Sequence, residues 1–319
     1  MRRLACALLG TVLVLSFPAS ATTIEAPGPA GPLQATLLTA PVDGAPVVLI
    51  IPGSGPTDRD GNNPLGVKAA TYRLLAEGLA ANGVTSARID KRGMFGSGQA
   101  VPDANAVSIG DYAADVQGWI AAVRNETGAS CIWLLGHSEG GLVALAAAQT
   151  PAGICGLILV AAAGRPLGAV MREQLKANPA NAPILDEALA AIDTLEAGRH
   201  IDISRLNPAL HPLFAPQVQD FLISEFALDP AELIAGIGRP ILILQGERDI
   251  QVDVADAKRL HAANPATRLV LLADTNHVLK RVTSDDRAAN TATYADADLP
   301  LAPGVVDAIA RFIKGAPAP

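Results

Sequence analysis

Short, continuously apolar runs alternate with segments of helical periodicity from residue 46 onward, and this alternation limits the fold more than any other feature. Strands buried on both faces of a parallel sheet have this apolar pattern, and they are predicted at 47–51, 84–89, 131–135, 156–160, 240–244 and 268–272. Helices are predicted at 67–81, 109–125, 140–149, 254–263 and 303–314. We therefore predict an α/β class with a mostly parallel, doubly wound sheet.

The alternation stops between residues 165 and 238, where prolines interrupt several helical patterns. We predict a helical cap insertion over 165–238, within a single α/β core formed by 45–164 and 239–319. Residues 22–44 are rich in Pro, Gly, Ala and Thr and contain one short alternating piece, so an edge strand or hairpin segment is expected there. A hydrophobic content of 50% is sufficient for a core of this size.

The N-terminus has the three parts of a secretory signal peptide. Two arginines are followed by an apolar stretch over 4–17 and then by Ala19-Ser20-Ala21. We predict a signal peptide over 1–21, a cut after Ala21, and a periplasmic or secreted protein. An uncleaved anchor is the alternative, but the apolar stretch is shorter than the ~20 residues that span a bilayer. No later stretch is long and apolar enough, so no stable membrane insertion is expected after cleavage.

A nucleophilic serine is predicted at Ser138, in the sequence Gly136-His137-Ser138-Glu139-Gly140. The G-x-S-x-G pattern alone is weak, but here a strand pattern precedes it and a helix pattern follows it. This is the setting of a nucleophile elbow. A serine hydroxyl needs a base and a third group that orients the base, so two further residues are required.

The acid and the base are expected after later strands, in the order Ser, Asp, His. Asp249 follows the strand at 240–244 and is our choice for the acid, and His277 follows the strand at 268–272 and is our choice for the base. The alternatives for the acid are Glu247, Asp253 and Asp256, which are expected to be solvated loop or helix-start charges. The other histidines, expected to be structural or solvated, are His137, His200, His211 and His261.

Backbone N–H groups should stabilise the oxyanion that forms during acyl transfer. The elbow provides the N–H of Glu139, and the loop after the first long strand should provide a second. Ser54 is the expected second donor, with its neighbour Gly53 as the alternative. A plain turn is the other interpretation of this loop.

These motifs together resemble the α/β-hydrolase superfamily, and within it the bacterial esterase D-like and serine-aminopeptidase-like (S33) hydrolases. The resemblance covers most of residues 45–315 and implies an α/β-hydrolase fold with a helical cap between the sixth and seventh strands. In this resemblance, four charged residues are typical of the family: Asp58, Arg59, Lys91 and Arg92. Their charges either hold loops together or contact the substrate. The motifs are Pro52-Gly-Ser-Gly-Pro-Thr-Asp-Arg-Asp-Gly-Asn62, Asp90-Lys-Arg-Gly93, Gly136-His-Ser-Glu-Gly140, Gln245-Gly-Glu-Arg-Asp-Ile-Gln-Val252 and Asn276-His-Val-Leu-Lys280.

Two cysteines follow the predicted cleavage site, Cys131 and Cys155, each at the start of a predicted strand. In this fold the two strands are neighbours, and an oxidising compartment permits a disulfide between them. Two buried free thiols are the alternative.

The predicted function is that of a serine hydrolase, with carboxylic esters of small to medium acyl groups as the leading substrate. A peptidase or amidase with the same triad is the alternative, and a non-catalytic binding protein is a more remote one.

No cofactor or metal is expected, because the sequence has no H-E-x-x-H, no Cys/His cluster and no complete G-x-G-x-x-G. The net charge of −7, without a basic cluster, also makes nucleic acid an unexpected partner. The acyl length and the oligomeric state stay open.

Overall fold

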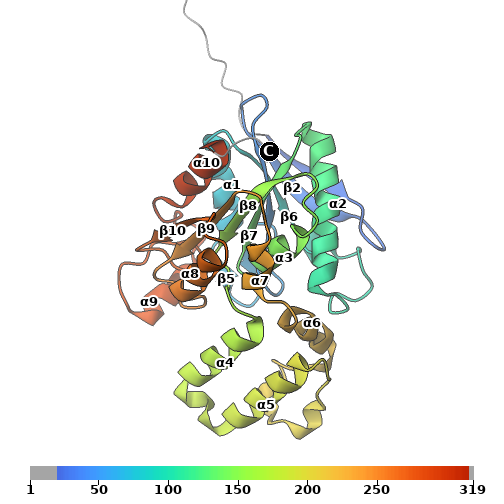
Figure 1. Ribbon diagram of the computed structural model, residues 1–319, viewed down its shortest axis with the longest axis vertical. Coiled ribbons are helices and arrows are strands. Elements are labelled where there is room, and N and C mark those ends of the chain that lie inside the picture. Colours follow the sequence, from blue (N-terminus) through green and yellow to red (C-terminus); the bar gives the residue numbers. More distant parts are fainter. Residues whose placement is uncertain (1–19, 316–319) are drawn as a thin grey trace, which may run out of the picture.

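The predicted parallel sheet is present in the computed structural model, which describes residues 20–315 (Figure 1). Its eight strands lie in the order β1-β2-β6-β3-β7-β8-β9-β10, and β6, β3, β7, β8, β9 and β10 run parallel. A two-stranded hairpin, β4 (Asn62–Asn63) and β5 (Val67–Lys68), stands apart from it. The fold class is confirmed. The strands of the main sheet are β1 (Ser20–Ala26), β2 (Leu33–Thr39), β3 (Val47–Ile51), β6 (Thr85–Ile89), β7 (Ile132–His137), β8 (Ile154–Val160), β9 (Ile241–Gly246) and β10 (Arg268–Leu272).

Helices cover both faces of the sheet, which explains why its central strands are apolar without alternation. Every residue of β3, β7 and β8 is buried. Helices α2, α3, α7 and α8 pack on one face, where Trp119 is fully buried, and α1 and α10 pack on the other. The bounds are α1 (Thr71–Ala81), α2 (Ile109–Thr127), α3 (Glu139–Ala147), α7 (Pro230–Ala235), α8 (Val254–Ala263), α9 (Arg287–Ala292) and α10 (Val305–Gly315).

A helical cap leaves the sheet after β8 and returns before β9, the sixth and seventh strands of the main sheet in chain order. It consists of α4 (Leu167–Ala177), α5 (Leu185–Glu196) and α6 (Pro216–Phe226), with short 3₁₀ helices between them. These helices form a layer below the sheet in Figure 1 and bury a core of their own around Phe214. The last helix of the predicted insertion, α7, packs against α3 and α8 and so belongs to the main core.

One predicted helix begins later than its periodicity suggests. Residues 67–68 pair with 62–63 as β5, and α1 begins only at Thr71. Ala70 stands before it with a left-handed φ of 49° and donates its N–H to Asn62 Oδ1 at 3.1 Å. Strand pairing therefore prevails over the helical pattern at 67–70.

The N-terminal segment contributes an antiparallel hairpin to one edge of the sheet. Strand β2 covers the expected edge strand, and β1 pairs along its outer side. The predicted signal peptide lies outside the described residues except for Ser20 and Ala21, which are exposed at the start of β1. Over residues 20–315, no helix is long and apolar enough to cross a membrane.

Candidate active site

Ser138 lies at the sharp turn between β7 and α3. Its φ of 56° and ψ of −122° are strained for a residue with a side chain. The turn is held by hydrogen bonds from Ser138 N to Val160 O and from Gly141 N to Ser138 O, both 2.9 Å. A Cβ atom at Gly136 would lie 2.1 Å from Gly140 O, so this turn can form only with glycine there. The backbone thus presents the Ser138 side chain at the carboxyl end of the sheet.

His277 and Asp249 form a buried pair in the loops that follow β10 and β9. His277 Nδ1 lies 2.8 Å from Asp249 Oδ2, and the two side chains are 6% and 1% exposed. The other carboxylate oxygen accepts the N–H groups of Gln251 and Val252 at 2.8 and 3.0 Å. Burial acts to raise the pKa of Asp249, but the charge and hydrogen bond of His277 and these N–H groups outweigh it and lower the pKa. An ionised Asp249 therefore orients His277 and leaves its Nε2 free for proton transfer.

The structure brings His277 and Ser138 together around one cavity of about 150 Å³, which Ser54 also lines.

The alternative acids have other surroundings. Asp253 caps α8, Asp256 binds the guanidinium of Arg165, and Glu247 is exposed. The remaining histidines also have structural surroundings. His200 pairs with Asp220, His211 faces the carbonyl of Leu206, His261 faces the hydroxyl of Thr267, and His137 is buried.

The loop after β3, which we call the oxyanion loop, contains both candidates for the second donor, Ser54 and Gly53. Their hydrogen bonds separate the two. The N–H of Gly53 is donated to Tyr72 Oη at 2.9 Å, so Gly53 must be withdrawn as a donor. Within residues 20–315, the N–H groups of Ser54 and Glu139 have no hydrogen-bond partner. Glu139 is the first residue of α3, whose N-terminus favours negative charge. Both residues line a cleft of about 640 Å³ together with Ser138.

A buried hydrogen-bond relay connects this loop with the elbow and the base. Tyr72 Oη lies 2.9 Å from His137 Nδ1, and His137 Nε2 lies 2.8 Å from the carbonyl oxygen of His277. Because a carbonyl can only accept, His137 carries its proton on Nε2, and its Nδ1 accepts from the Tyr72 hydroxyl. Burial, with the nearby His277, lowers the pKa of His137 to about 3, which keeps the ring neutral. Sequence reasoning treated His137 as structural and missed Tyr72.

A second buried contact lies beneath the elbow. Lys91 Nζ lies 3.0 Å from Glu139 Oε1 and donates to the carbonyl of Gly53 at 2.8 Å, and both charged side chains are 3% exposed. The Lys91 ammonium also lies 5.1 Å from the centre of the Tyr112 ring. Lys91 thereby ties the oxyanion loop to the first residue of α3.

The other charges typical of the family hold loops together. Arg59 binds Asp90 through its Nε at 2.8 Å, and Arg92 binds both oxygens of Asp115 at 2.6 Å. Asp58 accepts the N–H of Asn62 at 2.8 Å and so closes its own loop.

The cap contributes one buried carboxyl group to the cleft, Glu225 of α6. Burial and then the negative charge of Glu139 raise the pKa of Glu225 well above its ordinary value. Glu225 therefore favours its neutral, protonated form. In the described part of the chain, no group of three or more His, Cys, Asp or Glu side chains is placed to hold a metal ion.

Cys131 and Cys155 form a disulfide, with their Cα atoms 5.2 Å apart. Cys131 immediately precedes β7 and Cys155 lies in β8, its parallel neighbour. The bridge therefore joins the strand that leads to Ser138 to the strand that leads to the cap.

The chain is similar to known hydrolases in sequence and in fold. Residues 65–206 match the family described as serine aminopeptidase, S33. Esterase EstD of Thermotoga maritima is 25% identical over 240 residues, which cover 73% of this chain and 54% of that protein. The chain thus spans about half the length of this curated relative.

Two solved structures share the fold. A thermophilic esterase from Thermogutta terrifontis superposes with a TM-score of 0.55 at 20% identity, covering 93% of this chain and 99% of that one. The Pyrococcus furiosus esterase Pf2001 superposes with a TM-score of 0.59 at 14% identity, covering 97% and 95%. With this strand order and a sharp turn at Ser138 between a strand and a helix, the chain has the α/β-hydrolase fold, and its residues 65–206 are similar to the S33 family.

Proposed function

We propose that this protein is a serine hydrolase that cleaves carboxylic esters of small to medium acyl groups through Ser138, His277 and Asp249. The observation that carries the proposal is the buried 2.8 Å contact between His277 and Asp249, on a cavity that Ser138 also lines. The esterase names of the distant relatives support the ester substrate.

In the proposed reaction, Ser138 Oγ forms a bond to the acyl carbon while His277 Nε2 takes its proton. The oxyanion is held by the N–H groups of Ser54 and Glu139. The bond to the alcohol oxygen then breaks, and that oxygen receives the proton from His277. Water hydrolyses the acyl-enzyme through the same base and restores Ser138.

Replacing Ser138 with Ala tests the proposal directly. Hydrolysis of p-nitrophenyl acetate should fall by at least about a thousandfold, because the remaining groups have no nucleophile to activate. Ser284→Ala is a matched control, because Ser284 is exposed in a loop. Turnover retained by a folded Ser138→Ala protein would refute the proposal.

A peptidase or amidase with the same triad is the second candidate, supported by the S33 match over residues 65–206. The acyl step is common to both, so the leaving group has to be compared. Parallel turnover of an ester and an aminoacyl anilide separates the two. Lack of any reaction with a fluorophosphonate would favour the remote alternative, a non-catalytic binding protein.

We also propose that residues 1–21 are a cleaved leader and that the protein acts in the periplasm or outside the cell. The Cys131–Cys155 disulfide supports this, because disulfides persist in oxidising compartments. The intact mass of the exported protein should correspond to a chain that begins at Thr22. A cytoplasmic protein that begins at Met1 would contradict the proposal.

A further inference from the structure

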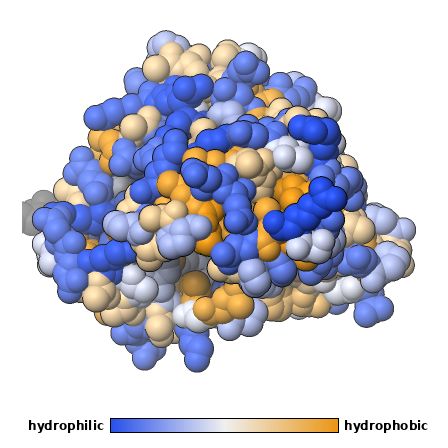
Figure 2. Space-filling model, turned by 90° about the horizontal axis from the view of Figure 1, so that it is seen from below, coloured by the Kyte–Doolittle hydropathy of each residue, from blue (hydrophilic) through white to orange (hydrophobic). Residues whose placement is uncertain are grey.

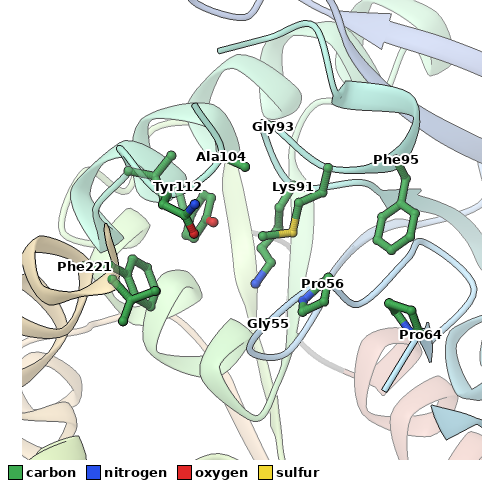
Figure 3. A pocket seen from close by; sticks show the side chains of 13 residues that line it. Gly55, Pro56, Pro64, Lys91, Gly93, Phe95, Ala104, Tyr112 and Phe221 are labelled. Atoms are coloured by element: carbon green, nitrogen blue, oxygen red, sulfur yellow. The ribbon is translucent and has the colours of Figure 1, made fainter. Parts of the chain in front are cut away.

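A second cavity of about 470 Å³ lies beside the oxyanion loop and contains none of the three proposed catalytic residues. Its size falls within the ~300–1,000 Å³ of small-molecule sites. Figure 3 shows Tyr112 and Phe221 on one side of it and Phe95 and Pro64 on the other, with Gly55 and Pro56 of the oxyanion loop between them.

This cavity adjoins the cleft that holds Ser138. Gly55 and Phe221 line both spaces. The two spaces therefore adjoin at these two residues.

The walls of this cavity are mostly apolar, with Asn105 as a polar residue among them. Lys91 is the charged residue that lines it, and its ammonium is already bound to Glu139 and to the carbonyl of Gly53. What Lys91 offers the cavity is its methylene stem. The rings of Tyr112 and Phe221 pack edge to face with centroids 5.9 Å apart. An alkyl chain is the ligand that such walls bind best.

A hydrogen bond between helices supports the wall of the cavity that α6 forms. Val218 and Phe221 lie one turn apart on α6, on the same face of that helix. Ser224 of the same helix accepts the N–H of Ile109 at 3.2 Å, which anchors α6 on α2.

Exposed apolar side chains lie at and beside the residues that line this cavity. Phe95, which lines it, is 49% exposed, and Leu65, which follows the lining residue Pro64 in the chain, is 85% exposed. Figure 2 shows the side of the molecule that carries the cap, where apolar side chains are visible between polar ones.

Proton transfer decides which part of an ester faces this cavity. His277 has to protonate the leaving oxygen, so the alcohol lies on the side of His277. That side is the cavity of about 150 Å³, which polar residues such as Thr57, Asn63 and Gln251 line. An acyl chain that points away from His277 would pass Gly55 on its way to the 470 Å³ cavity.

We propose that the 470 Å³ cavity binds the acyl chain, so that the preferred substrates are esters of a medium-length aliphatic acid with a small alcohol. This rests on the proposed esterase function. The specificity constant, kcat/KM, should rise by about fourfold per added methylene until the cavity is full.

A series of p-nitrophenyl esters from acetate to laurate tests the proposal, together with the variant Val218→Trp, which fills the cavity. In this variant the ratio of kcat/KM for octanoate to that for acetate should fall by at least about tenfold. Val42→Trp is a matched control, because Val42 is exposed and lines none of these cavities, and its ratio should equal that of the wild type. If Val218→Trp does not fold, Ala104→Leu should lower the ratio in the same direction.

A second series, with a fixed acetyl group and an alcohol of increasing length, assigns the cavity to one side of the ester. We expect no gain with alcohol length. A gain that follows the alcohol and is lost in Val218→Trp would overturn the acyl assignment. Equal losses for octanoate and acetate would also overturn it. Absence of any ester turnover would instead refute the proposed function.

Discussion

Tyr72 lies on the buried face of α1, and its hydroxyl connects the loop of Gly53 with the ring of His137. Its hydroxyl accepts from Gly53 and donates to His137, whose other nitrogen donates to the carbonyl of His277. One hydroxyl group thus positions both the oxyanion loop and the segment that carries the base.

Tyr72→Phe should therefore lower both stability and kcat. It leaves a buried N–H and a buried ring nitrogen without partners, at a cost of about 1–3 kcal/mol for each unpaired group. We expect kcat to fall by roughly tenfold with a much smaller change in KM, because the loop that carries the oxyanion donor is less well placed. Urea unfolding and ester kinetics measure the two effects.

Tyr112→Phe is the matched control for the unfolding measurement, because no hydrogen bond of the Tyr112 hydroxyl is found within residues 20–315. It should unfold as the wild type does. If Tyr72→Phe kept wild-type kcat and stability, the positioning role would be wrong.

The residues that follow strand ends were predictable, and those that act through side-chain contacts were not. Ser138, Asp249 and His277 each follow an apolar strand pattern, and the fold brings such positions to one edge of the sheet. Choosing between Ser54 and Gly53 required knowing where each N–H points. That depends on Tyr72, which lies 19 residues from Gly53 and has no sequence motif of its own.

At the scale of the elements, apolar runs predicted the central strands closely because those strands are buried on both faces. The predicted helix at 67–81 failed at its start, where pairing between β4 and β5 prevails over periodicity. Helix α9 has no clear apolar period and was not predicted. Between residues 165 and 238, prolines taken as helix breakers instead stand at the first positions of α6, in the cap, and of α7, in the main core, where a missing N–H costs nothing.

The disulfide between the start of β7 and β8 should contribute to stability. It closes a loop of 24 residues, and in the chain-entropy model removing it costs about 3 to 4 kcal/mol. The double variant Cys131→Ala/Cys155→Ala should lose this free energy of unfolding in urea.

Reductant provides the control. It should destabilise the wild type by a similar amount and leave the double variant unchanged. Labelling of two free thiols in the denatured, unreduced protein would contradict the bridge.

At the scale of the whole molecule, a parallel core with a cap was predictable, but the arrangement of the cap was not. Its helices pack on one another through Met171, Ile192 and Phe214, which are far apart in the chain. Arg165, at the entry to the cap, binds Asp256 of α8 through two contacts of 2.8 Å. Long-range contacts of this kind have no local pattern in the sequence.

Stability should fall in acid because His137 is buried in its neutral form. Its pKa in the folded protein is about 3, against an ordinary value of 6.5, so below pH 6.5 the unfolded chain binds a proton that the folded protein does not. This contribution is fully present above pH 6.5 and is lost as pH falls toward 3. Between pH 7 and pH 5 it amounts to about 2 kcal/mol.

Urea unfolding measures this difference. Between pH 7 and pH 5, the free energy of unfolding should fall less for His137→Gln than for the wild type. His200→Gln is the control, because His200 is 62% exposed, and it should lose as much as the wild type. An equal loss in all three proteins would show that His137 is not the titrating group.

Labelling with a fluorophosphonate tests whether Ser138 is the nucleophile of a serine hydrolase. We expect one adduct per chain, located by mass spectrometry on the peptide that contains Ser138 and absent from Ser138→Ala. An adduct on another residue, or ester hydrolysis by a protein that takes no label, would contradict it.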